Sequence, residues 1–276
     1  MNQHTHLFAH IFLVLKIRVL SLFIKIESDT SLPLVHGNLR LQKMLKDFPC
    51  GIGIYEDDMG KRVLLKTWKG SAKTYAYYQL LKEVRLYELL NGVIDRIGPS
   101  LEDKYRQVRI PRILEKEISP KKITAVFEYI EDSVHLSDIV SYSEKSRVYN
   151  LATDYWRYIG SHLNEDERKM LPRRNFIDTL IIYAIVLVYA VLRFPSKIPD
   201  LMRTASIVYG AIPLLRETWR EELIHRDFHF ENVLVNKDFI TIIDFGDNAL
   251  SHPLQIFTNS LHWEWENVES KKVILN

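Results

Sequence analysis

The segment Leu223–Asp247 reads LIHRDFHFENVLVNKDFITIIDFGD and decides the fold. Two apolar runs rich in valine and isoleucine flank the polar turn Asn236–Asp238, a pattern that predicts a β-hairpin. Asp227 and Asn232 precede the first strand, and Asp244 follows the second. Because a hairpin brings its outer ends together, we expect these three side chains to converge. Carboxylate and amide oxygens are ligands that suit Mg²⁺.

The spacing H-R-D-x-x-x-x-N, followed by D-F-G, resembles the catalytic and metal-binding loops of the protein-kinase superfamily. The resemblance implies catalytic roles for Asp227, Asn232 and Asp244. Asp227 would orient the substrate hydroxyl and accept its proton, while Asn232 and Asp244 would hold Mg²⁺ that bridges the phosphates of ATP. Positioning and charge neutralisation would then supply the rate. The alternative is an ordinary surface hairpin with scattered acids.

Composition places the chain among globular proteins. Of its 276 residues, 47% are hydrophobic and 26% are charged, and this length is enough for one or two domains. The formal net charge of +2 gives no argument for a nucleic-acid partner. Cys50 is the only cysteine, which excludes an intrachain disulfide and fits a cytoplasmic location.

Residues 1–38 form an N-terminal extension of uncertain role. Its apolar runs are interrupted by Lys16 and Arg18, so each is too short to span a bilayer, which takes about 20 residues. One interpretation is a packed or poorly ordered extension, and the other is an amphipathic membrane-surface anchor. We favour the packed or poorly ordered extension, so membrane association is the less favoured interpretation.

The next segment reads as a small antiparallel sheet. Gly51–Tyr55 and Arg62–Trp68 are expected strands joined by a polar turn. V-L-L-K resembles the V-A-I-K strand of kinases, which implies that Lys66 contacts the α/β-phosphates. A complete G-x-G-x-x-G is missing. Gly51 and Gly53 are either the remnant of a phosphate-covering turn or a simple bend before a strand.

Apolar residues recur at three- and four-residue steps from Lys73 to Leu90 and predict a helix that Asn91-Gly92 ends. By the resemblance, Glu83 on this helix pairs with the strand lysine, and Glu88 is the alternative. Ile123–Tyr129 is a further expected strand. The chain after it resembles the hinge between kinase lobes, which implies that the main chain of Glu128, Tyr129 and Ile130 pairs with adenine.

Residues 145–222 read as helical. Leu180–Leu192 is a run of consecutive apolar residues, which we interpret as a core helix buried against the catalytic lobe rather than a membrane span. Leu201–Glu222 is expected to form a second helix with Pro213 as a kink. Acidic residues in this region could attract a cationic alcohol or simply lie on solvated helix faces; they are Asp154, Glu165, Asp166 and Glu167.

No A-P-E follows Asp244, which separates the chain from ordinary protein kinases. The helical insertion before the catalytic loop and His229 make it similar to the aminoglycoside and choline phosphotransferase branch. Arg226 departs from that branch, and H-R-D-F also resembles lipopolysaccharide-core sugar kinases. We therefore expect an α+β, two-lobed, protein-kinase-like fold, with an N-lobe over 39–131 and a helical C-lobe over 132–276.

The predicted function is ATP- and Mg²⁺-dependent phosphoryl transfer to a hydroxyl of a small molecule. A protein kinase or a lipid-linked sugar kinase is one alternative, and a nucleotide-binding pseudokinase is another. The acceptor cannot be read from these residues.

Overall fold

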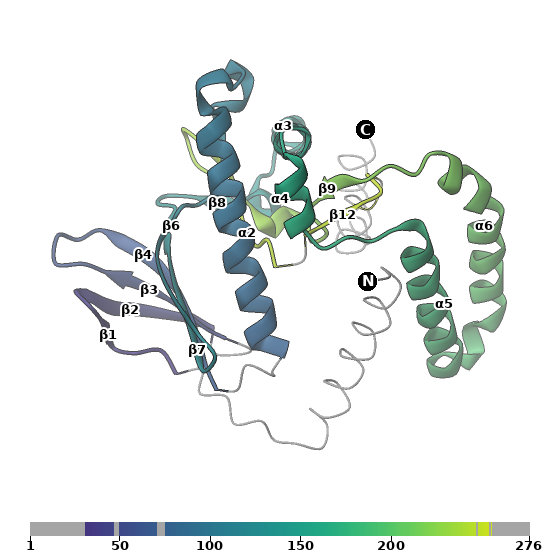
Figure 1. Ribbon diagram of the computed structural model, residues 1–276, viewed down its shortest axis with the longest axis horizontal. Coiled ribbons are helices and arrows are strands. Elements are labelled where there is room, and N and C mark those ends of the chain that lie inside the picture. Colours follow the sequence, from purple (N-terminus) through teal and green to yellow (C-terminus); the bar gives the residue numbers. More distant parts are fainter. Residues whose placement is uncertain (1–30, 47–49, 71–74, 247, 254, 256–276) are drawn as a thin grey trace.

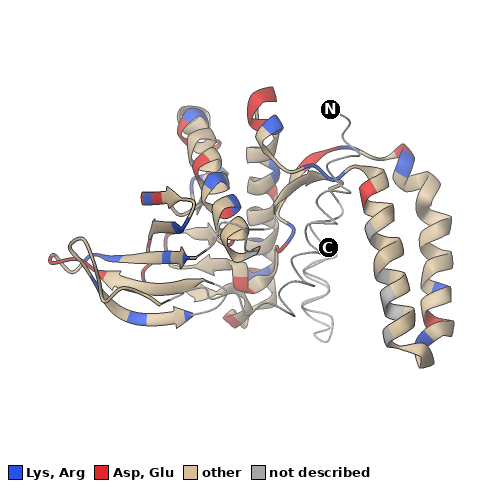
Figure 2. Ribbon diagram, turned by 60° about the horizontal axis from the view of Figure 1, so that its bottom comes forward, with Lys and Arg blue, Asp and Glu red and all other residues tan. Residues whose placement is uncertain are grey.

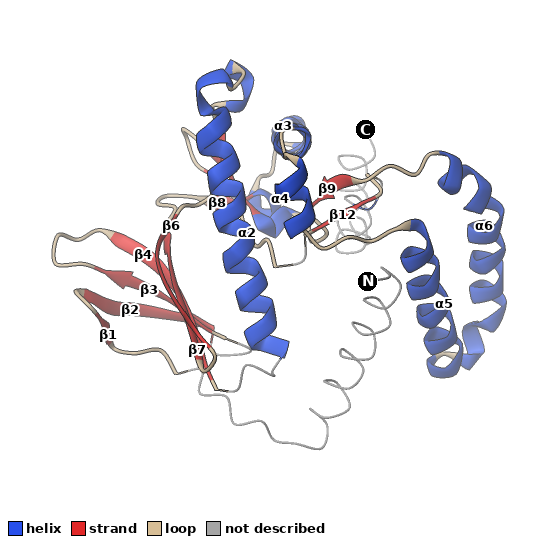
Figure 3. Ribbon diagram, viewed as in Figure 1, coloured by secondary structure: helices blue, strands red, loops and turns tan. Residues whose placement is uncertain are grey.

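The computed structural model describes residues 31–46, 50–70, 75–246, 248–253 and 255. Most of the predicted N-terminal extension therefore lies outside the described residues. A curved antiparallel sheet with one long helix is followed by a mainly helical part, as Figures 1 and 3 show. This architecture confirms the predicted α+β, two-lobed fold, whereas the exact lobe boundary at 131/132 stays a prediction.

The N-lobe is built on a six-stranded sheet with the order β1-β2-β3-β4-β7-β6, in which every neighbouring pair is antiparallel. Its strands are β1 (Val35–His36), β2 (Leu39–Lys46), β3 (Gly51–Glu56), β4 (Arg62–Lys69), β6 (Ile113–Ser119) and β7 (Lys122–Glu128). The two strands predicted around Gly51 and Lys66 are β3 and β4. Alternating burial along β3 and β4 gives the sheet two distinct faces.

Helix α2 (Tyr75–Ile97) crosses one face of this sheet. Its inward residues Val84, Tyr87 and Leu90 are almost fully buried in the main core. The prediction that Asn91-Gly92 ends the helix is wrong. The Asn91 amide instead donates to the Pro111 carbonyl at 3.3 Å, and buried apolar residues continue the inward stripe for almost two more turns.

The C-lobe surrounds the hairpin that the sequence predicts to be catalytic. Its helices are α3 (Tyr142–Ser161), α4 (Glu165–Met170), α5 (Phe176–Arg193) and α6 (Ile198–Glu217), with a short helix η3 (Leu136–Asp138) before α3. Strands β5 (Val108–Arg109), β11 (Ile240–Ile242), β10 (Val233–Val235) and β8 (Val134–His135) form one sheet, and β12 (Ala249–Ser251) pairs with β9 (Glu222–Ile224). Helix α3 packs on β9, with Trp156 fully buried beneath the hairpin.

Helices α5 and α6 form an antiparallel hairpin that stands apart from the N-lobe sheet and from α2 and α3 (Figure 1). The prediction that Leu180–Leu192 is buried against the catalytic lobe is wrong: Val188 is 59% exposed and Leu192 is 77% exposed. Among the described elements, α5 packs mainly on α6 and on the turn that joins them. One neighbouring helix covers only one side of another, so the apolar residues on the other side of α5 stay exposed.

The second predicted helix starts and ends earlier than expected, at Ile198 and Glu217, and Pro213 lies inside it. Pro199 occupies the first turn, where its missing N–H has no intrahelical partner to lose. Within the part of the chain that the structure describes, no helix is both long enough and apolar enough to cross a membrane.

Candidate active site

The predicted hairpin is present as β10 and β11, which pair from Val233↔Ile242 to Val235↔Ile240. Its turn is closed by Asn236, whose backbone amide donates to the Phe239 carbonyl at 3.0 Å. The Asn236 side-chain oxygen also accepts from the backbone amides of Asp238 and Phe239, at 3.0 and 2.8 Å. This turn fixes the register and therefore fixes which residues meet at the open end.

The open end of the hairpin brings the predicted catalytic residues together. The Asn232 side-chain amide donates to the Asp227 carbonyl at 2.8 Å and to its carboxylate at 3.4 Å. The Ile243 backbone amide donates to the Asn232 carbonyl at 3.0 Å, which places Asp244 directly beside this pair. Asp244 has φ of +61°, so its backbone is held in a left-handed conformation that turns the chain sharply after β11.

Two histidines support the loop. His229 lies with Nε2 at 3.6 Å from an Asp227 carboxylate oxygen and at 3.0 Å from the Asn232 amide nitrogen. His225 is buried, and its Nε2 lies 3.0 Å from the Ile243 carbonyl. Burial lowers the pKa of His225, although that hydrogen bond and Asp244 oppose the effect. A neutral His225 thus ties the strand before the catalytic loop to the residue before Asp244.

A cluster of aromatic rings lies beneath this loop. Phe245, next to Asp244, stacks on Trp156 of α3 with ring centroids 5.2 Å apart. The same ring contacts Tyr87 of α2 at 4.5 Å and His225 at 5.4 Å. These residues are all almost fully buried. The cluster therefore connects the N-lobe helix, the C-lobe helix and the catalytic loop through direct packing.

Lys66 and Glu83 form the predicted ion pair, with Nζ 2.6 Å from Oε1. Their side chains are only 12% and 9% exposed. Burial alone would lower the pKa of Lys66, but Glu83 and Asp244 raise it above its ordinary value, so the lysine stays charged. The alternative partner Glu88 instead pairs with Lys116 on β6, in a more exposed position. The pairing is observed, and the contact of Lys66 with phosphate stays a prediction.

The two predicted glycines lie inside β3 rather than in a loop. Gly53 pairs with Leu65, and Ile52 pairs with Lys66, so Gly53 and the Lys66 side chain belong to opposite faces of the sheet. A Cβ on Gly53 would lie 2.8 Å from side-chain carbons of Leu32 and Leu41. Close packing against Leu32 and Leu41, on the sheet face opposite Lys66, therefore explains the glycine at position 53. A phosphate-binding role for Gly51 stays a prediction.

The predicted hinge directly follows β7. The Glu128 carboxylate accepts from Arg109 at 3.0 Å and from the Arg112 backbone amide at 3.3 Å, so this side chain fastens the hinge to the segment before β6. The Ile130 backbone amide donates to no residue in the described part of the chain. The same holds for the Tyr129 backbone amide, so either group fits a main-chain contact with an adenine edge, and the role stays a prediction.

The donor set fits a hard divalent cation and a nucleotide. All side-chain hydrogen bonds of Asn232 to described residues involve its nitrogen, so its carbonyl oxygen has no such partner. The carboxylate of Asp244 follows at the other end of the hairpin, and Lys66 supplies a positive charge close to it. Mg²⁺ is commonly bound through one or two carboxylates with phosphate and water as further ligands.

Tyr87 is a site residue that the sequence reasoning missed. Its ring contacts Phe127 and Phe245, and its hydroxyl lies beside the backbone of Asp244. Tyr87 follows Glu83 by four residues and therefore shares its face of α2. The four-residue spacing from Glu83 is the sequence signal that indicates Tyr87 as a neighbour of the site.

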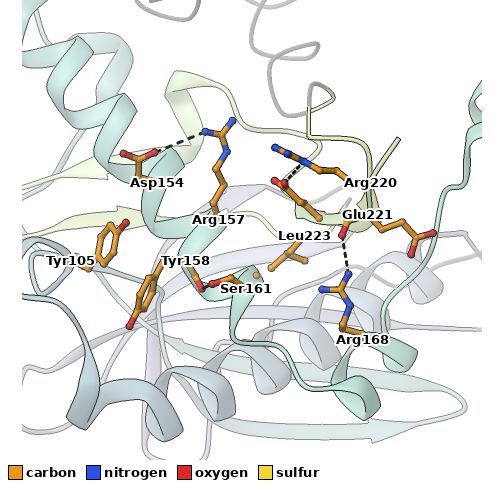
Figure 4. Close-up of a pocket in the computed structure, with 11 residues that line it drawn as sticks. Tyr105, Asp154, Arg157, Tyr158, Ser161, Arg168, Arg220, Glu221 and Leu223 are labelled. Atoms are coloured by element: carbon orange, nitrogen blue, oxygen red, sulfur yellow. Dashed lines mark hydrogen bonds and ion pairs between the residues drawn. The ribbon is translucent and has the colours of Figure 1, made fainter. Parts of the chain in front are cut away.

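A separate cavity of about 480 Å³ lies between α3, α4 and β9 (Figure 4). None of the predicted catalytic or nucleotide-binding residues lines it, whereas Asp154, considered for a cationic acceptor, does. Asp154 faces it and lies 4.0 Å from Arg157, and Arg168 donates to the Glu221 carbonyl at 2.8 Å. Glu167 forms the capping box of α4 and pairs with Arg96. Asp166 pairs with Lys169 at 2.8 Å, so three of the four acids considered for a cationic acceptor have local structural partners.

Comparisons with known proteins find one family match and several similar folds. The model of the Phosphotransferase enzyme family matches residues 192–273, a segment that contains the catalytic hairpin. No curated protein sequence matches the chain. The amicoumacin kinase hAmiN, solved with AMP-PNP, Ca²⁺ and Ami, is 13% identical with a TM-score of 0.54, over 94% of this chain and 75% of that one.

Two further solved structures are similar. A thermostable mutant of an aminoglycoside phosphotransferase, in ternary complex with AMP-PNP and hygromycin B, is 14% identical with a TM-score of 0.50, over 86% of this chain and 75% of that one. The choline kinase LicA from Streptococcus pneumoniae is 12% identical with a TM-score of 0.48, over 96% and 79% of the two chains. At these identities a likeness concerns the fold alone, and the two structures with TM-scores of at least 0.50 support the kinase-like architecture.

Proposed function

We propose that this chain, a phosphotransferase of the protein-kinase-like superfamily, uses Mg²⁺ and ATP to phosphorylate a hydroxyl of a small molecule. The prediction of a phosphotransferase with an alcohol acceptor is confirmed by the family match over the catalytic hairpin. The proposal adds the cofactors, the residues and the acceptor class. One observation carries it: Asp227, Asn232 and Asp244 meet at the open end of one hairpin, close to the buried Lys66–Glu83 pair.

Each residue has a separate task. Asp227 is one-third exposed, so an entering hydroxyl can reach its carboxylate, which would accept the proton. Asn232 and Asp244 would hold Mg²⁺, which neutralises phosphate charge when it is bound. Lys66 would contact the α/β-phosphates, and Glu83 keeps it in position. The role of His229 is to orient the Asp227 carboxylate together with the Asn232 amide.

The proposed acceptor class rests on the substrates for which structurally similar kinases are named. The solved kinases with TM-scores of at least 0.50 are named for amicoumacin and aminoglycosides, which are small molecules. Absence of a nucleic-acid partner and the cytoplasmic location remain predictions from charge and cysteine content. An acceptor screen with labelled ATP over aminoglycosides, choline-like alcohols, sugars and a generic protein tests the class. Transfer to the protein alone would favour a protein kinase, and no transfer at all would favour a pseudokinase.

The metal site has its own test. Asp244→Ala should abolish Mg²⁺-dependent binding of ATP, measured by calorimetry, because it removes the only carboxylate among the proposed ligands. Asp238→Ala is the matched control, since Asp238 is an exposed carboxylate at the other end of the same hairpin. Loss of binding in both variants, or in neither, would contradict the assignment.

A further inference from the structure

The α5–α6 hairpin is fastened to the C-lobe only near its base, within the described residues. There, Phe176 packs edge-on against Trp219 with ring centroids 5.6 Å apart, and Trp219 contacts His252 at 5.2 Å. The start of α5 is fixed by reciprocal bonds between Asn175 and Asp178. Beyond this base the two helices extend away from the rest of the described molecule (Figure 1). Within the described residues, the hairpin thus projects from the C-lobe and is held by contacts at its base.

Both helices of the projection carry exposed apolar side chains. On α5 the exposed apolar residues Ile177, Ile185, Val188 and Leu192 recur at helical spacing and form one stripe along the helix. On α6, Met202 is 57% and Ile207 is 65% exposed, and they lie on different faces of the helix because five residues turn it by about 140°. An exposed apolar stripe such as the one on α5 is a candidate site of interaction, because removing apolar surface from water is favourable.

Charge distinguishes the tip from the sides. Figure 2 shows that the hairpin is mostly uncharged between its ends. The tip, residues 192–203, contains three basic residues and one acid, Asp200. The basic residues Lys197 and Arg203 are exposed next to Leu192, Phe194 and Met202, which are exposed too. Apolar side chains beside basic ones are typical of segments that enter the headgroup layer of an anionic membrane.

We propose that the α5–α6 hairpin docks the protein on an anionic lipid surface, with the tip entering the headgroup layer. The apolar tip residues would leave water, and the nearby lysine and arginine would contact anionic headgroups. A second copy of the chain would have to pair along the α5 stripe, because a tip-to-tip contact would bring basic residues together. This proposal is independent of the proposed chemistry, since it uses no residue of the catalytic hairpin.

Co-sedimentation of the full-length protein with lipid vesicles tests the proposal. Wild-type protein should bind vesicles of phosphatidylglycerol and phosphatidylcholine and bind pure phosphatidylcholine vesicles much more weakly. The double variant Leu192→Asp/Met202→Asp should weaken binding by on the order of tenfold per residue. Lys197→Gln/Arg203→Gln should weaken binding by about fivefold per residue, and only with the anionic vesicles.

Met59→Asp/Val140→Asp is the matched control, because both side chains are 94% exposed and lie outside the hairpin. It should bind like wild type. Circular dichroism should show all variants folded, and the basic variant tests the proposal even if the aspartate variant unfolds. Equal binding of wild type and both hairpin variants would overturn the proposal, as would no binding by wild type. A dimer in sedimentation equilibrium that Leu192→Asp/Met202→Asp dissociates, without vesicle binding, would assign the surface to a second copy instead.

Discussion

The ion pair between Lys66 and Glu83 makes a quantitative prediction about stability. Replacing Glu83 by alanine leaves the Lys66 ammonium buried without its closest partner, 2.6 Å away in the native protein. Both side chains are about nine-tenths buried, so water and salt screen the pair weakly. Removing one partner of a buried pair costs about 3–5 kcal/mol. We expect Glu83→Ala to lower the free energy of unfolding by that amount.

Glu88→Ala is the matched control, since it removes a glutamate from the same helix. Glu88 pairs with Lys116, and both side chains are roughly two-fifths exposed. Surface pairs of this kind contribute about 0–1 kcal/mol. Urea unfolding followed by circular dichroism at neutral pH measures both losses. A cost for Glu83→Ala no larger than that for Glu88→Ala would refute the reasoning, because it would mean that Lys66 finds an equal partner or water.

Two further predictions concern packing and pH. Gly160→Ala should destabilise the protein by about 1–3 kcal/mol, because the new Cβ would lie 2.9 Å from the Leu223 Cβ on the strand that leads to His225. Gly92→Ala should instead stabilise the protein by about 0.5–1 kcal/mol, because a Cβ at this position of α2 has no atom within 4 Å. Equal effects of the two substitutions in thermal unfolding would contradict both predictions. Burial raises the pKa of Tyr155 to about 12, so the unfolded chain loses its proton first as the pH rises. Wild-type stability should therefore fall between about pH 10 and 12, by up to ~1.4 kcal/mol per pH unit, and Tyr155→Phe should remove that part of the slope in alkaline urea titrations.

The catalytic hairpin could be predicted from sequence because its signals are local. Strand composition, the Asn236 turn and the fixed spacing of Asp227, Asn232 and Asp244 all lie within one short segment. The Lys66–Glu83 pair was also predicted through the family resemblance, with Glu88 as the alternative, and the structure has Lys66 beside Glu83. Both glutamates lie on α2, and only the packing of that helix on the sheet decides which one faces Lys66.

The features that were missed depend on contacts between distant segments. The apolar run of α5 predicts a helix that avoids water, but it does not say what covers the helix. The Asn91-Gly92 pair is a valid helix-stop signal, which is overridden because Asn91 binds the chain at Pro111 and Ile113 instead. Gly53 lies in a strand for a packing reason that involves Leu32 and Leu41, neither of which is close to it in sequence.

The most direct test of the central claim compares nucleotide binding and turnover in Asp227→Asn. The substitution keeps the shape of the side chain and its position beside Asn232, but an amide cannot accept the proton of the acceptor hydroxyl. With an acceptor from the screen, kcat should fall by about 10²–10⁴-fold, while the affinity for Mg²⁺ and ATP stays close to that of wild type. Near wild-type turnover in Asp227→Asn would contradict the assignment of this hairpin as the phosphoryl-transfer site.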